Sequence, residues 1–199
     1  MEPAYDRLAR FYDTCFSPME RGFLGRWRAE ALGELPEGAD ILELGAGTGA
    51  NFKYYPPSHL AVSSELSGEM LSIARTKTRG NLLVQADAQQ LPFPANSFDA
   101  VFATLVFCSI PDPAKAFGEV RRVLRPGGRV VLLEHVRPPG WLGRVFDAAS
   151  KATVALIDDH FDRRTAEIAA ASGLRVVEVR TRLRGVVNLI VCQEENRAE

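Results

Sequence analysis

The stretch from residue 43 to residue 49 constrains this chain most. It follows an apolar run, residues 41–44, that predicts a buried strand, and it places glycines at alternate positions: Gly45, Gly47 and Gly49. Because glycine has no Cβ, the backbone of such a turn can approach a bulky ligand closely. A helical segment behind the turn would offer free backbone amides to polar ligand atoms. The turn therefore predicts a site for a nucleoside-type cofactor.

The same motif has two other interpretations. With Ala50 in its sixth place, it also fits the loose G-x-G-x-x-A pattern of dinucleotide-binding turns. A glycine-rich turn between a strand and a helix can also be merely tight and bind nothing. The remaining segments of the chain bear on this choice.

Length, charge and cysteines limit the class of protein. A chain of 199 residues fits one domain with a sizeable core. The net charge of −1 gives no overall positive field, so we expect no nucleic-acid partner. The cysteines lie far apart and form no C-x-x-C motif, which favours a reducing compartment. No apolar run is long enough to span a bilayer and no signal-peptide pattern begins the chain, so we expect a cytoplasmic protein.

Apolar strands alternate with helical segments through the middle of the chain. Strands are predicted at residues 41–44, 60–64, 82–85, 98–103 and 129–134, and the longer helices between them at residues 67–79 and 111–124. Pro56 and Pro57 keep the helix after the glycine turn short. This alternation predicts an α/β fold with a doubly wound, mostly parallel sheet.

The two ends of the chain depart from this alternation. Residues 19–35 are expected to form a helix that buries its aromatic and aliphatic side chains and carries its Arg and Glu residues on the opposite face. We expect residues 1–35 to form a helical lid or cap on a domain of residues 36–199. Near the C-terminus, strands at residues 175–181 and 186–193 are joined by a short turn and are expected to pair antiparallel. A terminal hairpin is not the usual ending of a dinucleotide-binding domain.

Five segments, taken together, resemble the class I S-adenosylmethionine-dependent methyltransferases. They are the glycine turn, Glu65, Asp87 ahead of Leu91-Pro92-Phe93, Phe98-Asp99, and residues 124–128. The resemblance covers nearly the whole chain after residue 35, and the five segments occur in order at suitable spacing. It implies a Rossmann-like methyltransferase fold, with S-adenosylmethionine as methyl donor and S-adenosylhomocysteine as product.

The resemblance also implies cofactor contacts at the ends of the predicted strands. Glu65 would accept hydrogen bonds from both ribose hydroxyls. Asp87 would face the adenine amino group, and Ala88 would offer its backbone amide to the ring. Glu43 would orient the loop and the cofactor's ammonium group, and Thr104 would lie near the methionine moiety. The full expected set is Glu43, Gly45, Ala46, Gly47, Gly49, Glu65, Leu66, Asp87, Ala88, Thr104 and Tyr12, with Tyr5 and Tyr12 as parts of a lid.

Simpler roles and departures from the family pattern accompany these assignments. Glu65 can also be a solvated acid at a helix start, and Asp87 an N-cap or turn residue. The resembling family more often has Asp in place of Glu65. It usually has Gly and an apolar residue where this chain has Ser63 and Ser64. These departures bear on cofactor affinity rather than on the fold.

The sequence defines the catalytic residues less well. Candidates are Cys108 and His135 at strand ends, and His160 beside Asp158 and Asp159 as a general base. The alternative is that these side chains cap helices or form structural hydrogen bonds. The His, Cys and acidic residues show no metal-ligand spacing, so we expect no metal.

The acceptor is expected to be a small or lipid-like molecule: a phospholipid amine, a quinone precursor or a thiol. Residues 45–57, 105–110 and 134–136 resemble the alkyl thiol methyltransferases and the bacterial phospholipid and quinone methyltransferases. Residues 140–157 carry apolar side chains on one helical face, which could wall an apolar pocket, touch a membrane peripherally or pack on the sheet. In-line transfer would depend on positioning and on exclusion of water.

Two other functions remain open at this point. A nicotinamide-dependent oxidoreductase would fit the G-x-G-x-x-A pattern, although the hairpin ending, Asp87 and the short first helix argue against it. A non-catalytic module that keeps the cofactor fold is the other alternative, and the intact glycine turn and both carboxylates argue against it. The sequence does not indicate an oligomeric state.

Overall fold

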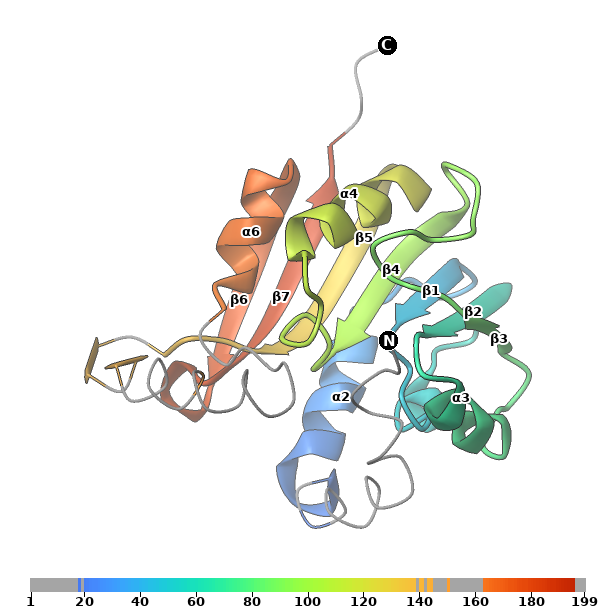
Figure 1. The fold of residues 1–199 in the computed structure, drawn as a ribbon, viewed down its shortest axis with the longest axis horizontal. Helices are drawn as coiled ribbons and strands as arrows, with labels where there is room; N and C mark the ends of the chain where they lie inside the picture. Colours follow the sequence, from blue (N-terminus) through green and yellow to red (C-terminus); the bar gives the residue numbers. More distant parts are fainter. Residues whose placement is uncertain are drawn as a thin grey trace.

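A seven-stranded mixed sheet forms the centre of the molecule (Figure 1). The computed structural model describes residues 18, 20–138, 140–141, 143–144, 150 and 163–195. The strands are β1 (Asp40–Leu44), β2 (Leu60–Glu65), β3 (Leu82–Gln85), β4 (Phe98–Thr104), β5 (Leu124–His135), β6 (Leu174–Arg182) and β7 (Val187–Glu194). Their order across the sheet is β3-β2-β1-β4-β5-β7-β6, and β7 runs antiparallel to both of its neighbours. The predicted parallel sheet with an antiparallel C-terminal hairpin is confirmed.

The register of the parallel strands brings their carboxyl ends together. Leu44 at the end of β1 lies opposite Ser64 of β2 and Ala103 of β4. β3 pairs with β2 in the same direction, so that Glu65 lies opposite Gln85. Open α/β sheets bind ligands at this edge, beyond the carboxyl ends of their strands.

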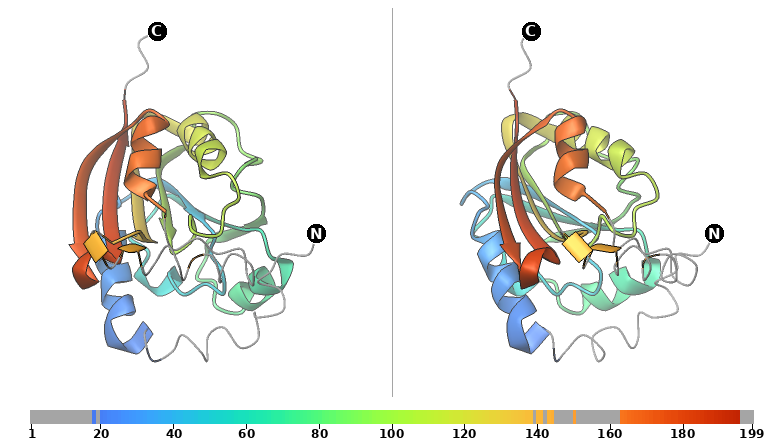
Figure 2. Two further views of the ribbon diagram at one scale, coloured as in Figure 1. Left: turned by 60° about the vertical axis from the view of Figure 1, so that its left-hand side comes forward. Right: turned by 90° about the vertical axis from the view of Figure 1, so that its left-hand side faces the viewer.

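Helices cover both faces of the sheet, and the side chains of β1 and β4 are accordingly buried almost without interruption. On one face, Trp27 and Ala31 of α2 (Gly25–Leu32) belong to one cluster with Phe102 of β4. On the other face lie α4 (Pro113–Val123) and α6 (Thr165–Ala171), where Phe117 stacks on Phe107 with ring centroids 4.3 Å apart. Figure 2 shows α2 and the pair α4 and α6 on opposite sides of the sheet.

Some predicted boundaries are wrong in detail. The helix predicted at residues 67–79 is the shorter α3 (Gly68–Arg75), which begins after an N-cap bond from the Met70 amide to the Ser67 hydroxyl at 3.1 Å. The first helix begins with a π-helical turn, Glu20–Leu24. β5 begins at Leu124 rather than at residue 129, because Leu124 pairs with Phe98 before an irregularity in the register.

Among the described helices, none is long and apolar enough to cross a membrane.

Candidate cofactor site

The glycine turn after β1 is the centre of the candidate site. Gly45, Gly47 and Gly49 have φ angles of 60°, 55° and 82°, a region that other residues rarely adopt. A Cβ on Gly45 would lie 2.6 Å from methyl carbons of Val106, and one on Gly49 would lie 2.5 Å from the ring of Phe52. A Cβ on Gly47 would meet no protein atom within 4 Å. Packing therefore explains the first and third glycines, whereas the second faces open space.

Glu65 lies beside this turn at the end of β2. One carboxylate oxygen accepts the backbone N–H of Gly47 at 2.8 Å, and the other accepts the N–H of Ser67 at 2.8 Å. These two donors fix the orientation of the carboxylate. A carboxylate oxygen has two lone pairs and can accept more than one hydrogen bond. Glu65 is therefore tied to the glycine turn rather than a freely solvated acid.

Asp87 follows β3 at the same edge of the sheet. Its Oδ1 accepts the backbone N–H of Gln89 at 2.8 Å and the Gln89 side-chain amide at 3.1 Å. This geometry makes Asp87 a turn residue, while a carboxylate retains further acceptor capacity.

Leu66 directly follows Glu65, and it is 49% exposed. An exposed leucine at this edge offers an apolar surface to a planar ring.

Glu43 lies in β1 just before the turn and is fully buried. Its carboxylate accepts hydrogen bonds from the Asn51 amide and the Tyr55 hydroxyl. Burial raises the pKa of Glu43, while the hydrogen bonds from Tyr55 and Asn51 and the charge of Arg28 act in the opposite direction. Burial also raises the pKa of Tyr55, and the neighbouring Glu43 carboxylate raises it further. A positive charge on a ligand beside this acid would favour its ionised form.

Arg28 contributes a positive charge to this site from α2. It is 6% exposed, and its guanidinium donates to Asn51 Oδ1 at 2.9 Å, to the Thr104 hydroxyl, and to Glu20 Oε2 at 3.1 Å. The prediction that the arginines of this helix lie opposite its buried face is wrong for Arg28, because polar partners on the sheet side satisfy its donors. Sequence reasoning also missed Asn51 and Tyr55, although both lie in the segment that carries the family resemblance.

Ser63 and Ser64, which depart from the family pattern, take part in the same network. The Ser63 hydroxyl lies 2.7 Å from the Tyr55 hydroxyl and accepts from the Asn81 amide at 2.8 Å. The Ser64 hydroxyl donates to the backbone carbonyl of Glu43 at 2.9 Å. The two serines therefore support the site rather than leave it incomplete.

The candidate catalytic residues are only partly placed. Cys108 is buried in the loop after β4, and His135 ends β5. The Val106 backbone amide donates to both carboxylate oxygens of Glu134, at 3.1 and 3.2 Å, and so ties this loop to the end of β5. Within the described ranges, no group of three or more His, Cys, Asp and Glu residues is arranged to hold a metal ion. The predicted residues Tyr5, Tyr12, Asp158, Asp159 and His160 lie outside the described residues.

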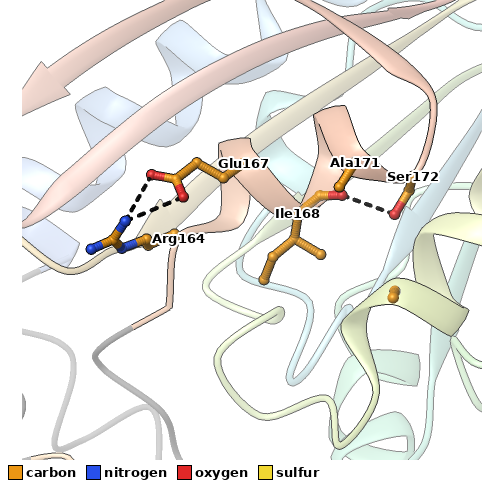
Figure 3. Close-up of a pocket in the computed structure, with 6 residues that line it drawn as sticks. Arg164, Glu167, Ile168, Ala171 and Ser172 are labelled. Atoms are coloured by element: carbon orange, nitrogen blue, oxygen red, sulfur yellow. Dashed lines mark hydrogen bonds and ion pairs between the residues drawn. The ribbon is translucent and has the colours of Figure 1, made fainter.

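A shallow pocket lies apart from these residues, between α4 and α6 (Figure 3). Its polar groups are paired locally: Arg164 lies 3.4 Å from Glu167, and the Ser172 hydroxyl donates to the Ile168 carbonyl at 2.8 Å. None of the expected cofactor residues lines it. We therefore do not assign the cofactor to this pocket.

Known proteins resemble this chain over a range that includes the glycine turn, Glu65 and Asp87. Residues 42–132 match the family model described as a methyltransferase domain. A demethylmenaquinone methyltransferase of Thermus thermophilus is 38% identical over 152 residues, which cover 71% of this chain and 69% of that protein. A ubiquinone/menaquinone biosynthesis C-methyltransferase of Hahella chejuensis is 30% identical over 166 residues, which cover 77% and 67%. The chain thus spans about two thirds of the length of these relatives.

Solved structures show the same fold. A Thermotoga maritima protein, described as an S-adenosylmethionine-dependent methyltransferase and possible histamine N-methyltransferase, superimposes with a TM-score of 0.77. The match covers 96% of this chain and 99% of that one, at 21% identity. At this identity the likeness concerns the fold alone.

Proposed function

The chain belongs to the class I S-adenosylmethionine-dependent methyltransferases, and from this premise we propose that it methylates a hydrophobic quinone precursor at a ring carbon. The observation that carries the proposal is the alignment of most of the chain with two relatives named as quinone-precursor methyltransferases. The enzyme class and the methyl donor follow from the family. The acceptor and the role of each site residue are the proposed part.

The methyl donor would lie over the glycine turn, across the carboxyl ends of β1 to β4. The open space above Gly47 supports this placement, because the other two glycines are explained by packing. Glu65, held by the Gly47 and Ser67 amides, would accept hydrogen bonds from the ribose hydroxyls. Asp87 would accept a hydrogen bond from the adenine amino group. The buried carboxylate of Glu43 would attract the ammonium group of the methyl donor.

An apolar surface at the same edge of the sheet supports a hydrophobic acceptor. Trp141 is 75% exposed, and Leu183, in the turn after β6, is 52% exposed. Figures 1 and 2 both show this turn beside the described residues 140, 141, 143 and 144. Since β6 runs parallel to β5, its carboxyl end lies at the edge that carries the glycine turn. A quinone with an apolar tail would approach from this edge.

The turn after β6 carries a leucine and an arginine at positions with positive φ angles. These angles are 48° for Leu183 and 56° for Arg184, and Gly or Asn would adopt them at lower cost. A leucine and an arginine are therefore not the residues that this backbone would favour on steric grounds. Arg184 and Arg144 are exposed and suit anionic head groups, as expected for a peripheral contact.

The transfer would be an in-line displacement. The bond from the methyl carbon to the cofactor sulfur breaks as a bond to the ring carbon forms, and S-adenosylhomocysteine leaves. The ring carbon must then lose its proton, so a general base helps this acceptor more than it would help a thiolate. Among the described residues, His135 at the end of β5 is our candidate for that base.

An acceptor panel tests the proposal. The protein would be incubated with methyl-labelled S-adenosylmethionine and, separately, a short-chain demethylmenaquinone reduced to its electron-rich quinol, phosphatidylethanolamine and an alkyl thiol. We expect label in the quinone ring and in neither other acceptor. Label in the phospholipid or the thiol would overturn the quinone assignment. Absence of label from every acceptor, with measurable cofactor binding, would favour a non-catalytic module.

The membrane contact has its own test. Replacing both Trp141 and Leu183 by serine should reduce sedimentation with anionic vesicles and raise the KM for a long-tailed quinone. Val177→Ser is the matched control, because Val177 is an exposed apolar residue (53%) elsewhere in β6. Equal effects of the control and the double variant would remove this surface from the proposal.

The nicotinamide-dependent alternative is not supported. The dinucleotide-binding domains have a parallel sheet of order 3-2-1-4-5-6, whereas β7 here lies antiparallel between β5 and β6.

A further inference from the structure

We propose that Arg28 is a positioning residue for the methyl donor: through Asn51 and Thr104 it keeps the buried Glu43 carboxylate charged and available to the donor's ammonium group. The inference rests on the cofactor placement under the proposed function and is independent of the acceptor.

The contacts of Arg28 join three separate parts of the chain. The same guanidinium nitrogen, Nη1, donates to Asn51 Oδ1 and to the Thr104 hydroxyl. Asn51 in turn donates from its Nδ2 to Glu43 and to Thr104, the latter at 2.8 Å. Arg28 therefore fixes the orientation of the Asn51 amide, because an amide that accepts from arginine with its oxygen must present its nitrogen to Glu43.

Glu43 depends on such a charge because the described side chains that donate hydrogen bonds to it are neutral. Asn51 and Tyr55 each donate one hydrogen bond to the carboxylate. Burial favours the protonated acid, and neutral donors offset only part of that effect. The charge of Arg28 lowers the pKa of Glu43 and so favours the carboxylate. An ionised Glu43 attracts an ammonium group, whereas a protonated one does not.

Among the residues that the structure describes, the other charged groups near this network do not replace Arg28. Glu20 accepts from the Arg28 Nε at 3.1 Å, and Lys53, which is half exposed, lies 4.0 Å from Glu20. Glu20 is therefore bound at Nε of the guanidinium, whereas Asn51 and Thr104 are bound at Nη1. From β2, Glu65 adds negative charge, and its two oxygens are held by backbone amides. β4 contributes the uncharged Thr104.

The backbone of α2 holds Arg28 in place. The neighbouring Trp27 is buried in the cluster that α2 forms with the sheet, and Arg28 is buried beside it. Arg26 on the same helix is exposed. One helix thus offers a buried arginine and an exposed arginine two positions apart, which makes Arg26 a matched control.

The experiment measures the Kd of S-adenosylhomocysteine from pH 6 to pH 8 by calorimetry, for wild type, Arg28→Met, Arg28→Lys and Arg26→Met. In wild type and Arg26→Met, we expect little change of Kd with pH. In Arg28→Met, the pKa of Glu43 rises further, so Kd should be about tenfold weaker at pH 6 and should recover as the pH increases. Arg28→Lys should restore part of the loss.

A purely structural role gives a different result. It would weaken binding by the same factor at every pH, and this outcome, or an unchanged Kd, would overturn the proposal. If Arg28→Met does not fold, Arg28→Gln decides by the same criterion, since glutamine keeps a donor for Asn51 and Thr104 and removes only the charge. The expected pH dependence together with an inactive acceptor panel would refute the quinone assignment and leave this inference standing.

Discussion

The backbone amide of Gly47 donates to the carboxylate of Glu65 across 2.8 Å. This bond joins the turn after β1 to the end of β2, residues that are 18 positions apart in the sequence. The group expected to hold the ribose therefore also holds the turn on which the cofactor would lie. Loss of Glu65 should consequently lower the affinity for the nucleoside and also remove the selectivity for its ribose hydroxyls.

Glu65→Ala tests that double role. We expect the affinity for S-adenosylhomocysteine to fall by about 1.5–3 kcal/mol, the range for a hydrogen bond to a charged group. The variant should also lose the preference for S-adenosylhomocysteine over its 2′-deoxy analogue, which is measured by competition binding. Glu69→Ala, at an exposed position of α3, is the control. A variant that keeps the full preference would show that another group reads the ribose.

Asp87 can be tested by two substitutions that separate charge from turn geometry. Asp87→Ala removes both the acceptor for the Gln89 amide and the charge, and should weaken cofactor binding by about 1.5–3 kcal/mol. Asp87→Asn keeps a turn acceptor and should lose less. Fluorescence titration with an adenosine-containing ligand measures both affinities. If the two variants bind as wild type does, Asp87 serves the turn alone.

Glu43→Gln should separate stability from binding. Because the pKa of Glu43 is raised in the folded protein, unfolding releases a proton at pH values between the ordinary pKa of 4.5 and the raised pKa of the folded state. The ionisation of Glu43 therefore lowers the free energy of unfolding as the pH rises, and glutamine removes this effect. We expect a higher Tm than wild type at pH 8, a smaller difference near pH 4.5, and weaker cofactor binding.

Exposed Glu37 provides the control for that measurement. Glu37→Gln should change neither the Tm nor the affinity. A Glu43→Gln protein with a lower Tm at pH 8 would mean that the hydrogen bonds of the carboxylate outweigh the cost of its burial.

Local sequence patterns predicted the structural elements whose backbone geometry is set by a few neighbouring residues. The glycine turn, the short helix ended by Pro56 and Pro57, and the acid at the end of β2 all follow from spacing within a few residues. The alternation of strands and helices then predicted the parallel sheet. These features could be found because the backbone geometry that they require is set locally.

Long-range contacts account for what was missed. Arg28 is buried because Asn51 and Thr104, 23 and 76 residues away, accept from its guanidinium, and helical periodicity contains no information about such partners. The hairpin was predicted, but its insertion with β7 against β5 depends on pairing across the sheet. The early start of β5 likewise depends on the pairing of Leu124 with Phe98.

The central claim is that S-adenosylmethionine lies over Gly47, and one pair of variants tests it most directly. Gly47 and Gly38 both have positive φ angles, 55° and 71°, and a Cβ on either would meet no protein atom within 4 Å. Gly47→Val and Gly38→Val should therefore carry similar backbone strain, roughly 1–2 kcal/mol. Only Gly47 lies in the turn at the carboxyl ends of the strands.

The measurement is calorimetric binding of S-adenosylhomocysteine to both variants, after each is shown to be folded. We predict that Gly38→Val binds as wild type does and that Gly47→Val shows no measurable binding. Wild-type affinity in Gly47→Val, or an equal loss in both variants, would contradict the placement of the cofactor.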